Sequence, residues 1–240
     1  MRISLIFAVV ASLLISTHTL AQSPYSFSGG RDGALVGGGG IMVGMGLIIG
    51  KKVPAPTAEE IAALDAQGIW GPDRWSTRQH SLSAKKLSDG LLFSSYLLPA
   101  ALLAGAQSRE DFGAVGLLTA EALLLNSGIT GLTKVLARRK RPFLYSDNYR
   151  QHAWDHPPAR MSFFSGHTSN TACMSFLTAQ LYSDYYPESR SKGWMWGAAV
   201  AIPAITGYSR MKAGKHFLTD VLVGYAVGAA VGMLVPRLHR

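Results

Sequence analysis

Cysteine is nearly absent from this chain of 240 residues, because Cys173 is the only one. A single cysteine excludes a disulfide within the chain and a cysteine-rich metal site. Charged residues are also scarce, at 15% against about 25% in typical soluble domains. The charge that remains is unbalanced, with 23 lysines and arginines against 14 acidic residues, which gives a net charge of +9.

The sequence also lacks internal repeats and the strict alternation of apolar and polar residues that marks a strand. Apolar runs are instead separated by short polar breaks, and their lengths suit helices. The runs cover residues 90–106, 112–133, 165–182, 193–208 and 217–235. They predict an all-α bundle of several helices.

Several features of these runs favour a membrane environment. Small residues are abundant in them, and Trp194, Trp196 and Tyr208 lie near run ends, where membrane proteins place interfacial aromatic residues. Some runs have only about 16–19 residues, at the short end of a membrane span. We expect a membrane bundle, with a soluble helical protein of large core as the alternative.

The N-terminus resembles an export signal. Arg2 precedes an apolar run over 3–15, and Thr19-Leu20-Ala21 forms a small-residue cleavage site. The sequence therefore predicts a signal peptide over 1–21, or an uncleaved anchor, followed by a Gly-rich and polar segment over 22–89 and a helical bundle over 90–240.

Within the segment 22–89, residues 22–33 are expected to form a flexible lead. Residues 34–50 are apolar but contain four consecutive glycines, which weaken a helix. With a cleaved signal, five spans from residue 90 onward would place 134–160 and 208–216 outside the membrane. A sixth span at 34–50 would reverse this topology.

Basic residues concentrate between 134 and 160. Lys134 and Arg141 are seven apart, hence on one helix face, and Pro142 ends the helix. With Arg210 they offer three cations for a phosphate, Arg through paired donors and Lys as a point charge. A patch that contacts anionic lipid or nucleic acid is the alternative. We favour that alternative for the three basic residues between Lys134 and Arg141, namely Arg138, Arg139 and Lys140.

Two histidines accompany these cations. His216 and Asp220 are four apart at a helix start, so a carboxylate can orient the imidazole and leave Nε2 free as a nucleophile. In Ser165-Gly166-His167, the serine is suited to cap a helix, the glycine lets backbone N–H groups approach an anion, and the histidine can act as a general acid. Taken singly, each motif is better explained by an ordinary capped helix start with a polar histidine.

Together and in this order, the motifs resemble the signature of the type-2 phosphatidic acid phosphatase (PAP2) superfamily. Lys134, Arg141 and Pro142 match its first part, Ser165-Gly166-His167 its second, and Ser209-Arg210, His216 and Asp220 its third. The resemblance covers about 90–235 and implies a multi-helix membrane bundle of the PAP2 type. The family usually has proline before Ser-Gly-His, where this chain has Phe164, and residues 22–89 match no known pattern.

The resemblance also implies a role for each residue. His216 attacks phosphorus and forms a phosphohistidine, Asp220 orients it, and His167 protonates the leaving alkoxide and later activates water. The phosphate oxygens are held by five residues, Lys134, Arg141, Ser165, Gly166 and Arg210. Neither a metal nor another cofactor is expected for this chemistry, and His152, Asp155 and His156 are interpreted as a polar loop.

The expected function is that of a metal-independent phosphatase in the bacterial inner membrane, with its site facing the periplasm. Its partners would be a lipid phosphomonoester or pyrophosphate and membrane lipids, not nucleic acid, and its oligomeric state stays open. One alternative is a soluble periplasmic acid phosphatase for small phosphomonoesters. Others are a non-enzymatic membrane protein that binds anionic lipids and, more remotely, a vanadate haloperoxidase.

Overall fold

The computed structural model describes residues 23–146 and 157–240. Within these ranges the regular structure is entirely helical, which confirms the predicted all-α class. The expected signal peptide at 1–21 and the loop with His152, Asp155 and His156 lie outside the described residues.

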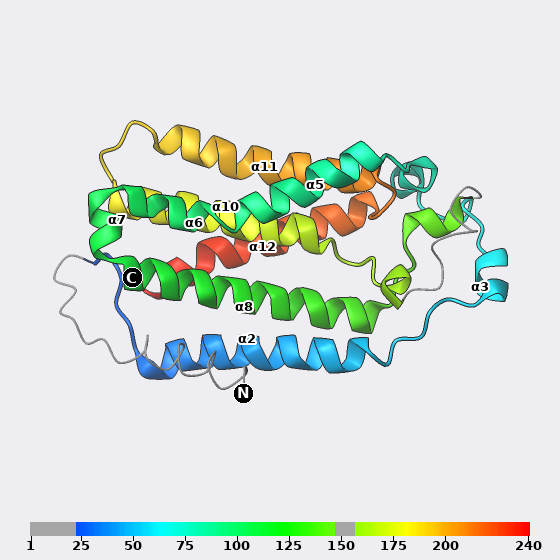
Figure 1. The fold of residues 1–240 in the computed structure, drawn as a ribbon, viewed down its shortest axis with the longest axis horizontal. Helices are drawn as coiled ribbons and strands as arrows, with labels where there is room; N and C mark the ends of the chain where they lie inside the picture. Colours follow the sequence, from blue (N-terminus) through cyan, green and yellow to red (C-terminus); the bar gives the residue numbers. More distant parts are fainter. Residues whose placement is uncertain (1–22, 147–156) are drawn as a thin grey trace.

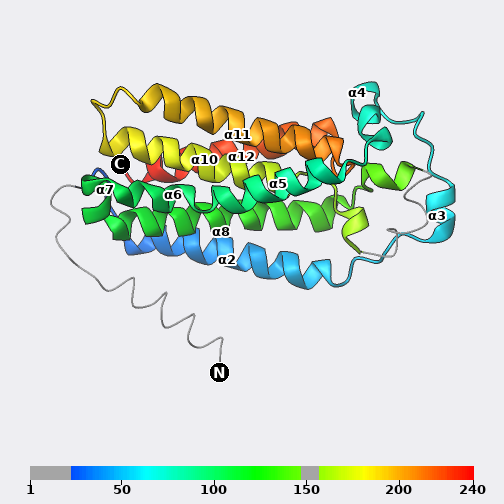
Figure 2. The same ribbon diagram turned by 45° about the horizontal axis from the view of Figure 1, so that its top comes forward.

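Long helices run alongside one another and form an elongated bundle (Figures 1 and 2). They are α2 (Gly29–Gly50), α5 (Leu82–Ser95), α8 (Phe112–Ala137), α10 (Gly166–Tyr185), α11 (Lys192–Lys212) and α12 (Leu218–Leu238). Shorter helices connect them, namely α3 (Ala58–Ala62), α4 (Gly71–Arg74), α6 (Leu98–Ala101) and α7 (Ala106–Glu110). Single 3₁₀ turns occupy Trp75–Arg78, Leu102–Ala104, Pro142–Tyr145 and Pro157–Arg160.

Helix α10 forms the centre of the bundle. It packs against α12, α11, α8 and α5, and the stretch from Thr171 to Leu181 is buried throughout. Leu177 and Met174 are fully buried, and the hydroxyl of Thr178 bonds to the carbonyl of Met174 one turn earlier. Ser169 also donates to the side chain of Asn126 on α8, so part of the polar content of α10 is satisfied within the bundle.

Glycines on α12 allow its backbone to touch α10. A Cβ atom added at Gly224, Gly228 or Gly232 would lie 2.6, 2.0 or 2.4 Å from a backbone oxygen of α10 or its N-cap residue. Real Cβ atoms never come so close, so only glycine permits this approach. The contact fixes the start of α10 against the start of α12, and these are the two ends that carry His167 and Asp220.

The N-terminal segment departs from the expectation. Helix α2 begins at Gly29, capped by the side chain of Ser28, so the expectation of a flexible lead is wrong for residues 29–33. Two of its glycines serve packing, because a Cβ atom at Gly39 or Gly46 would lie 2.9 or 3.2 Å from the backbone of α8. The expected boundary at residue 90 falls inside α5.

By length and composition, α2, α12 and α8 with its following turn could each cross a membrane. Helix α5 and the turn formed by α6 and Leu102–Ala104 would add a fourth span, bent by 47°. In the described part of the chain, α10 and α11 do not meet these criteria, although both were expected to span. Large apolar side chains point outward from the spans, such as Ile41, Leu47 and Leu136, which are more than 60% exposed.

Substitution of Gly228 tests the close packing of α10 and α12. We expect Gly228→Ala to lower the free energy of unfolding by about 1–3 kcal/mol, because its methyl group would meet the carbonyl of Ser169. Gly37→Ala is the matched control, since nothing lies within 4 Å of its added Cβ. Thermal unfolding in detergent measures both, and equal midpoints would contradict the packing described.

Candidate active site

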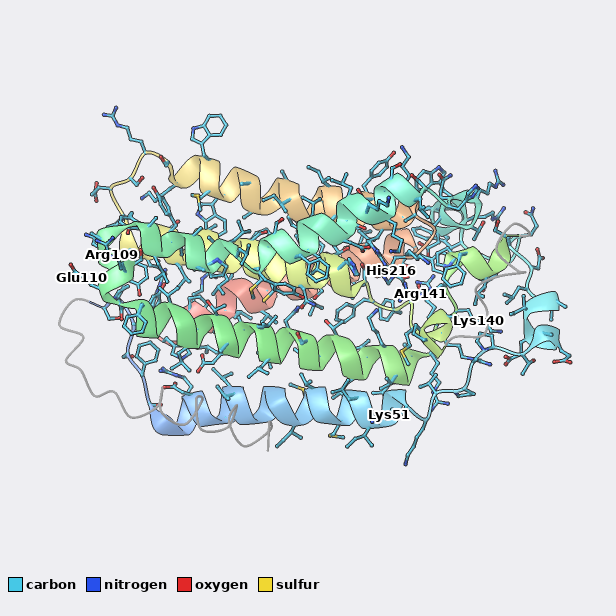
Figure 3. The ribbon with its side chains drawn as sticks, in the orientation of Figure 1. Lys51, Arg109, Glu110, Lys140, Arg141 and His216 are labelled. Atoms are coloured by element: carbon cyan, nitrogen blue, oxygen red, sulfur yellow. The ribbon has the colours of Figure 1, made fainter. Side chains whose placement is uncertain are left out.

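The three motifs meet at one end of the bundle. The end of α8, the start of α10, the end of α11 and the start of α12 lie together there (Figure 1). Figure 3 shows His216 and Arg141 side by side at this end, with Arg109 and Glu110 at the opposite one. The structure thus brings together residues that lie up to about eighty positions apart in the chain.

His216 is buried beside Arg141. Its Nε2 atom lies 3.4 Å from a guanidinium nitrogen of Arg141, and its side chain is 2% exposed. Burial holds the pKa of His216 well below its usual value, and the charges of Arg141, Lys134 and Arg210 lower the pKa further. The imidazole is therefore neutral at physiological pH, which is the form that a nucleophile requires.

Asp220 lies in the first turn of α12, but His216 precedes the N-cap residue Phe217, so the two do not share a helix face as expected. The expected hydrogen bond between them is not formed. His216 Nδ1 lies 3.5 Å from Asp220 Oδ2. That oxygen accepts hydrogen bonds from the hydroxyl of Ser162 at 2.5 Å and from the backbone N–H of Phe217 at 2.9 Å. Catalytic hydrogen bonds commonly shorten when substrate binds, so this geometry is compatible with an orienting carboxylate.

Arg139 bridges two buried carboxylates. It donates to Asp220 Oδ1 at 2.5 Å and to Asp73 Oδ2 at 2.8 Å, and it lies over the ring of Phe217. Thr219 also donates to Asp73 from both its backbone and its hydroxyl. The interpretation of Arg139 as part of a patch contacting lipid or nucleic acid is therefore wrong.

Lys134 and Arg141 are held by backbone carbonyls. Lys134 Nζ donates to the carbonyls of Met161 at 3.1 Å and Phe164 at 2.5 Å, and Arg141 donates to those of Pro158, Met161 and Lys215. An ammonium has three N–H bonds, so Lys134 keeps one for another acceptor. Phe164, which stands where the family pattern has proline, takes part through its carbonyl.

Ser165 and Gly166 start α10 as expected. The Ser165 side chain caps the helix by accepting from the N–H of Thr168, and its own N–H donates to the carbonyl of Asp220. A Cβ atom at Gly166 would lie 3.4 Å from Cε of Lys134. Glycine at this position therefore keeps the start of the helix close to the lysine.

Asp89 joins the two remaining predicted residues. Its Oδ1 atom lies 2.9 Å from His167 Nε2 and 3.1 Å from a guanidinium nitrogen of Arg210, and its other oxygen pairs with Lys85. Arg210 Nε is buried and has no hydrogen-bond partner among the described residues. This N–H could serve a phosphate oxygen.

A tight turn delivers His216 to the site. Gly214 has a φ angle of +66°, and a Cβ atom there would lie 2.1 Å from the carbonyl oxygen of Gln79. Gln79, Asp73 and Asp89 all belong to the segment 22–89, and sequence reasoning found no role for them. The spacing of Lys85 and Asp89, one helical turn apart, was the only local signal for any of these contacts.

Comparison with known proteins adds to this geometry. The profile described as the PAP2 superfamily matches residues 115–240. The chain belongs to the PAP2 superfamily. All eight site residues taken from the family signature lie inside the matched range, whereas Asp73, Gln79 and Asp89 lie outside it.

Curated relatives carry names of phosphatases. The chain is 27% identical over 134 residues to a lipid A 4'-phosphatase of Porphyromonas gingivalis, covering 55% of this chain and 53% of the relative. It is 37% identical over 75 residues to phosphatidylglycerophosphatase B of Bacillus subtilis, covering 31% of this chain and 37% of the relative. For mouse phospholipid phosphatase 2 the identity is 37% over 89 residues, with 33% and 30% covered.

These matches span about half or less of the length of each relative. No solved structure matches the chain significantly. The PAP2 assignment therefore rests on the matched profile and the curated relatives, and the arrangement of the site rests on the contacts described above.

Removal of Arg139 tests the bridge between Asp73 and Asp220. We expect Arg139→Gln to lower the free energy of unfolding by about 3–5 kcal/mol, because two buried carboxylates lose their shared cation. Arg138→Gln is the matched control, since Arg138 is the adjacent arginine and is exposed. If thermal unfolding shows equal losses for the two variants, the bridge does not stabilise this end of the bundle.

Proposed function

We propose that this PAP2 chain is a membrane phosphatase that hydrolyses a lipid phosphomonoester or pyrophosphate through a phosphohistidine on His216. The observation that carries the proposal is the position of His216 Nε2, 3.4 Å from Arg141, within a group of cations that keeps the imidazole neutral. Such a nitrogen can attack phosphorus while the cations hold the phosphate oxygens.

In the first step, Nε2 of His216 bonds to phosphorus and the bond to the leaving oxygen breaks. Asp220 stabilises the imidazolium that forms, and Lys134, Arg141 and Arg210 balance the charge on the phosphate oxygens. The free N–H of Arg210 Nε supports this role. Ser165 and the Gly166 N–H assist at the start of α10.

His167 would donate a proton to the leaving alkoxide. In the second step it would take a proton from the water that attacks the phosphohistidine, so inorganic phosphate leaves and His216 is regenerated. Asp89, bonded to His167 Nε2, would orient this ring. The scheme uses only residues of this chain for proton transfer and needs no metal ion.

A lipid substrate is favoured by the surroundings of the site. The site lies at the end of helices that are long and apolar enough to cross a membrane, and their outward side chains are apolar. The curated relatives are named for lipid A, phosphatidylglycerophosphate and phospholipids. These names favour a lipid phosphate over a small soluble phosphomonoester as the proposed substrate of this chain.

Replacement of the nucleophile tests the mechanism. We expect His216→Ala to lower phosphate release at least about a thousand-fold in excess EDTA, because it removes the attacking nitrogen. Purified protein in detergent would be assayed with several lipid phosphates, a lipid pyrophosphate and a small soluble phosphomonoester. His80→Ala is the control, since His80 is an exposed histidine.

Equal release by the wild type and His216→Ala would reject the phosphohistidine mechanism. Release from no substrate would favour the non-enzymatic lipid-binding alternative. A preference for the small phosphomonoester would favour the acid phosphatase.

We further propose that the site faces the periplasm. Lys51, at the end of α2, lies at the same end of the bundle as the site (Figure 3). If α2 spans the membrane, a periplasmic site requires the N-terminal end of α2 to lie in the cytoplasm. A signal peptide cleaved after residue 21 would instead leave the N-terminal end of α2 in the periplasm. If α2 spans the membrane, the expected cleaved signal and the expected periplasmic site therefore cannot both be correct.

Cysteine labelling tests this orientation, because the native Cys173 is buried. We expect Lys51→Cys to react with a membrane-impermeant maleimide in intact spheroplasts. Glu110→Cys, at the opposite end (Figure 3), should react only after lysis. The reverse pattern would place the site in the cytoplasm and restore the exported signal.

A further inference from the structure

A second polar cluster lies at the other end of the bundle, far from the active site. The cluster consists of two carboxylates and one imidazole, from Asp32 of α2, Glu121 of α8 and His239 at the end of α12. All three are buried, with Glu121 and His239 fully so. Glu121 is 13 positions before Lys134 on α8, a rise of about 20 Å along the helix.

Hydrogen bonding alone does not account for this cluster. Both oxygens of Glu121 and the Nε2 atom of His239 lack a hydrogen-bond partner among the described residues. A buried carboxylate without donors is costly unless it is neutralised, paired or bound to a metal. Both buried oxygens of Glu121 therefore face His239 and Asp32 without a hydrogen-bond donor from the described residues.

Two distances in the cluster are close to those between ligands of one metal ion, and all three candidate ligand atoms lie within 4.8 Å of one another. His239 Nε2 lies 3.1 Å from Glu121 Oε2 and 3.3 Å from Asp32 Oδ1. A charge-assisted N–H···O bond is about 2.7–2.9 Å long. Ligand atoms at about 2.0–2.1 Å from a tetrahedral zinc ion lie about 3.3–3.4 Å apart. At these distances, one imidazole N–H shared by two carboxylates would make a weak hydrogen bond to each. A cation placed among the three groups would contact all of them.

Outer contacts prepare two of the three groups for this role. His239 Nδ1 lies 2.8 Å from the carbonyl of Val235 and donates to it, which leaves the lone pair of Nε2 for the cluster. Asp32 is oriented by the N–H of Ser28 at 2.9 Å and by Arg31 at 3.0 Å. Such second contacts are typical of metal ligands. The ring of Phe27 lies over His239 and shields it.

We propose that Asp32, Glu121 and His239 bind a divalent transition-metal ion, with zinc fitting one imidazole and two carboxylates best. The ion joins α2, α8 and α12 at the end of the bundle opposite His216. Three protein ligands leave a position for water. The site is structural, because it is too distant to touch a phosphate held by Arg141.

Metal content and stability test the proposal on untagged protein in detergent. We expect wild type incubated with zinc and then desalted to retain about one equivalent by mass spectrometry of the metal. Glu121→Gln and Asp32→Asn should retain less than about a tenth. Glu110→Gln, which changes an exposed carboxylate at the same end (Figure 3), should retain the ion like the wild type.

Thermal unfolding gives a second readout that does not depend on the measurement of metal content. Zinc should raise the unfolding temperature of EDTA-treated wild type and leave that of Glu121→Gln unchanged. Phosphate release assayed well below that temperature should persist in EDTA, so failure of this site and failure of the proposed catalysis are distinguishable.

Two results would overturn the metal site. One is the absence of retained zinc together with an unchanged unfolding temperature. The other is equal zinc retention by Glu121→Gln, which would place the ion elsewhere.

Discussion

The arrangement of the bundle end that carries His216 depends on the hydrogen bonds of one buried carboxylate, that of Asp220. A buried anion must be surrounded by donors. Its donors come from distant segments, namely Arg139 after α8, Ser162 before α10 and the N–H of Phe217 at the start of α12. Satisfying this one group therefore fixes three segments against each other. His216, four residues earlier, is held by the same arrangement.

The cations around His216 repel one another, and backbone carbonyls keep them in place. Carbonyl dipoles offset part of the charge on Lys134 and Arg141 without adding a full negative charge. Arg210 is different, because it pairs with the carboxylate of Asp89, which also contacts His167. Asp89 thus holds His167 beside Arg210. The excess positive charge that remains suits a substrate with two negative charges.

Sequence reasoning succeeded where the signal was local. The cap at Ser165 depends only on the start of one helix and forms as expected. Sequence reasoning also placed Lys134 and Arg141 on one helix face, which is wrong, because α8 ends at Ala137 and Arg141 lies in the segment after it. It failed where the partner lay far away in the chain. Arg139 looked like one more residue of a basic run, and only the fold brings Asp73 to it. From sequence, the glycines at 37–40 argued against a stable helix there. The close packing of Gly39 against α8, which explains a glycine at that position, cannot be inferred from helix propensity.

The segment 22–89 contributes contacts to both ends of the bundle, although it lies outside the range matched by the PAP2 profile. The matched range contains His216 and the cations Lys134, Arg141 and Arg210, whereas Asp73 and Asp89 supply counter-charges from before it. Gln79 fits against the Gly214 turn. At the other end, Asp32 brings α2 to His239. Because Asp73 and Asp89 lie outside the matched range, a change at either residue would alter the electrostatics of this end of the bundle and leave His216 in place.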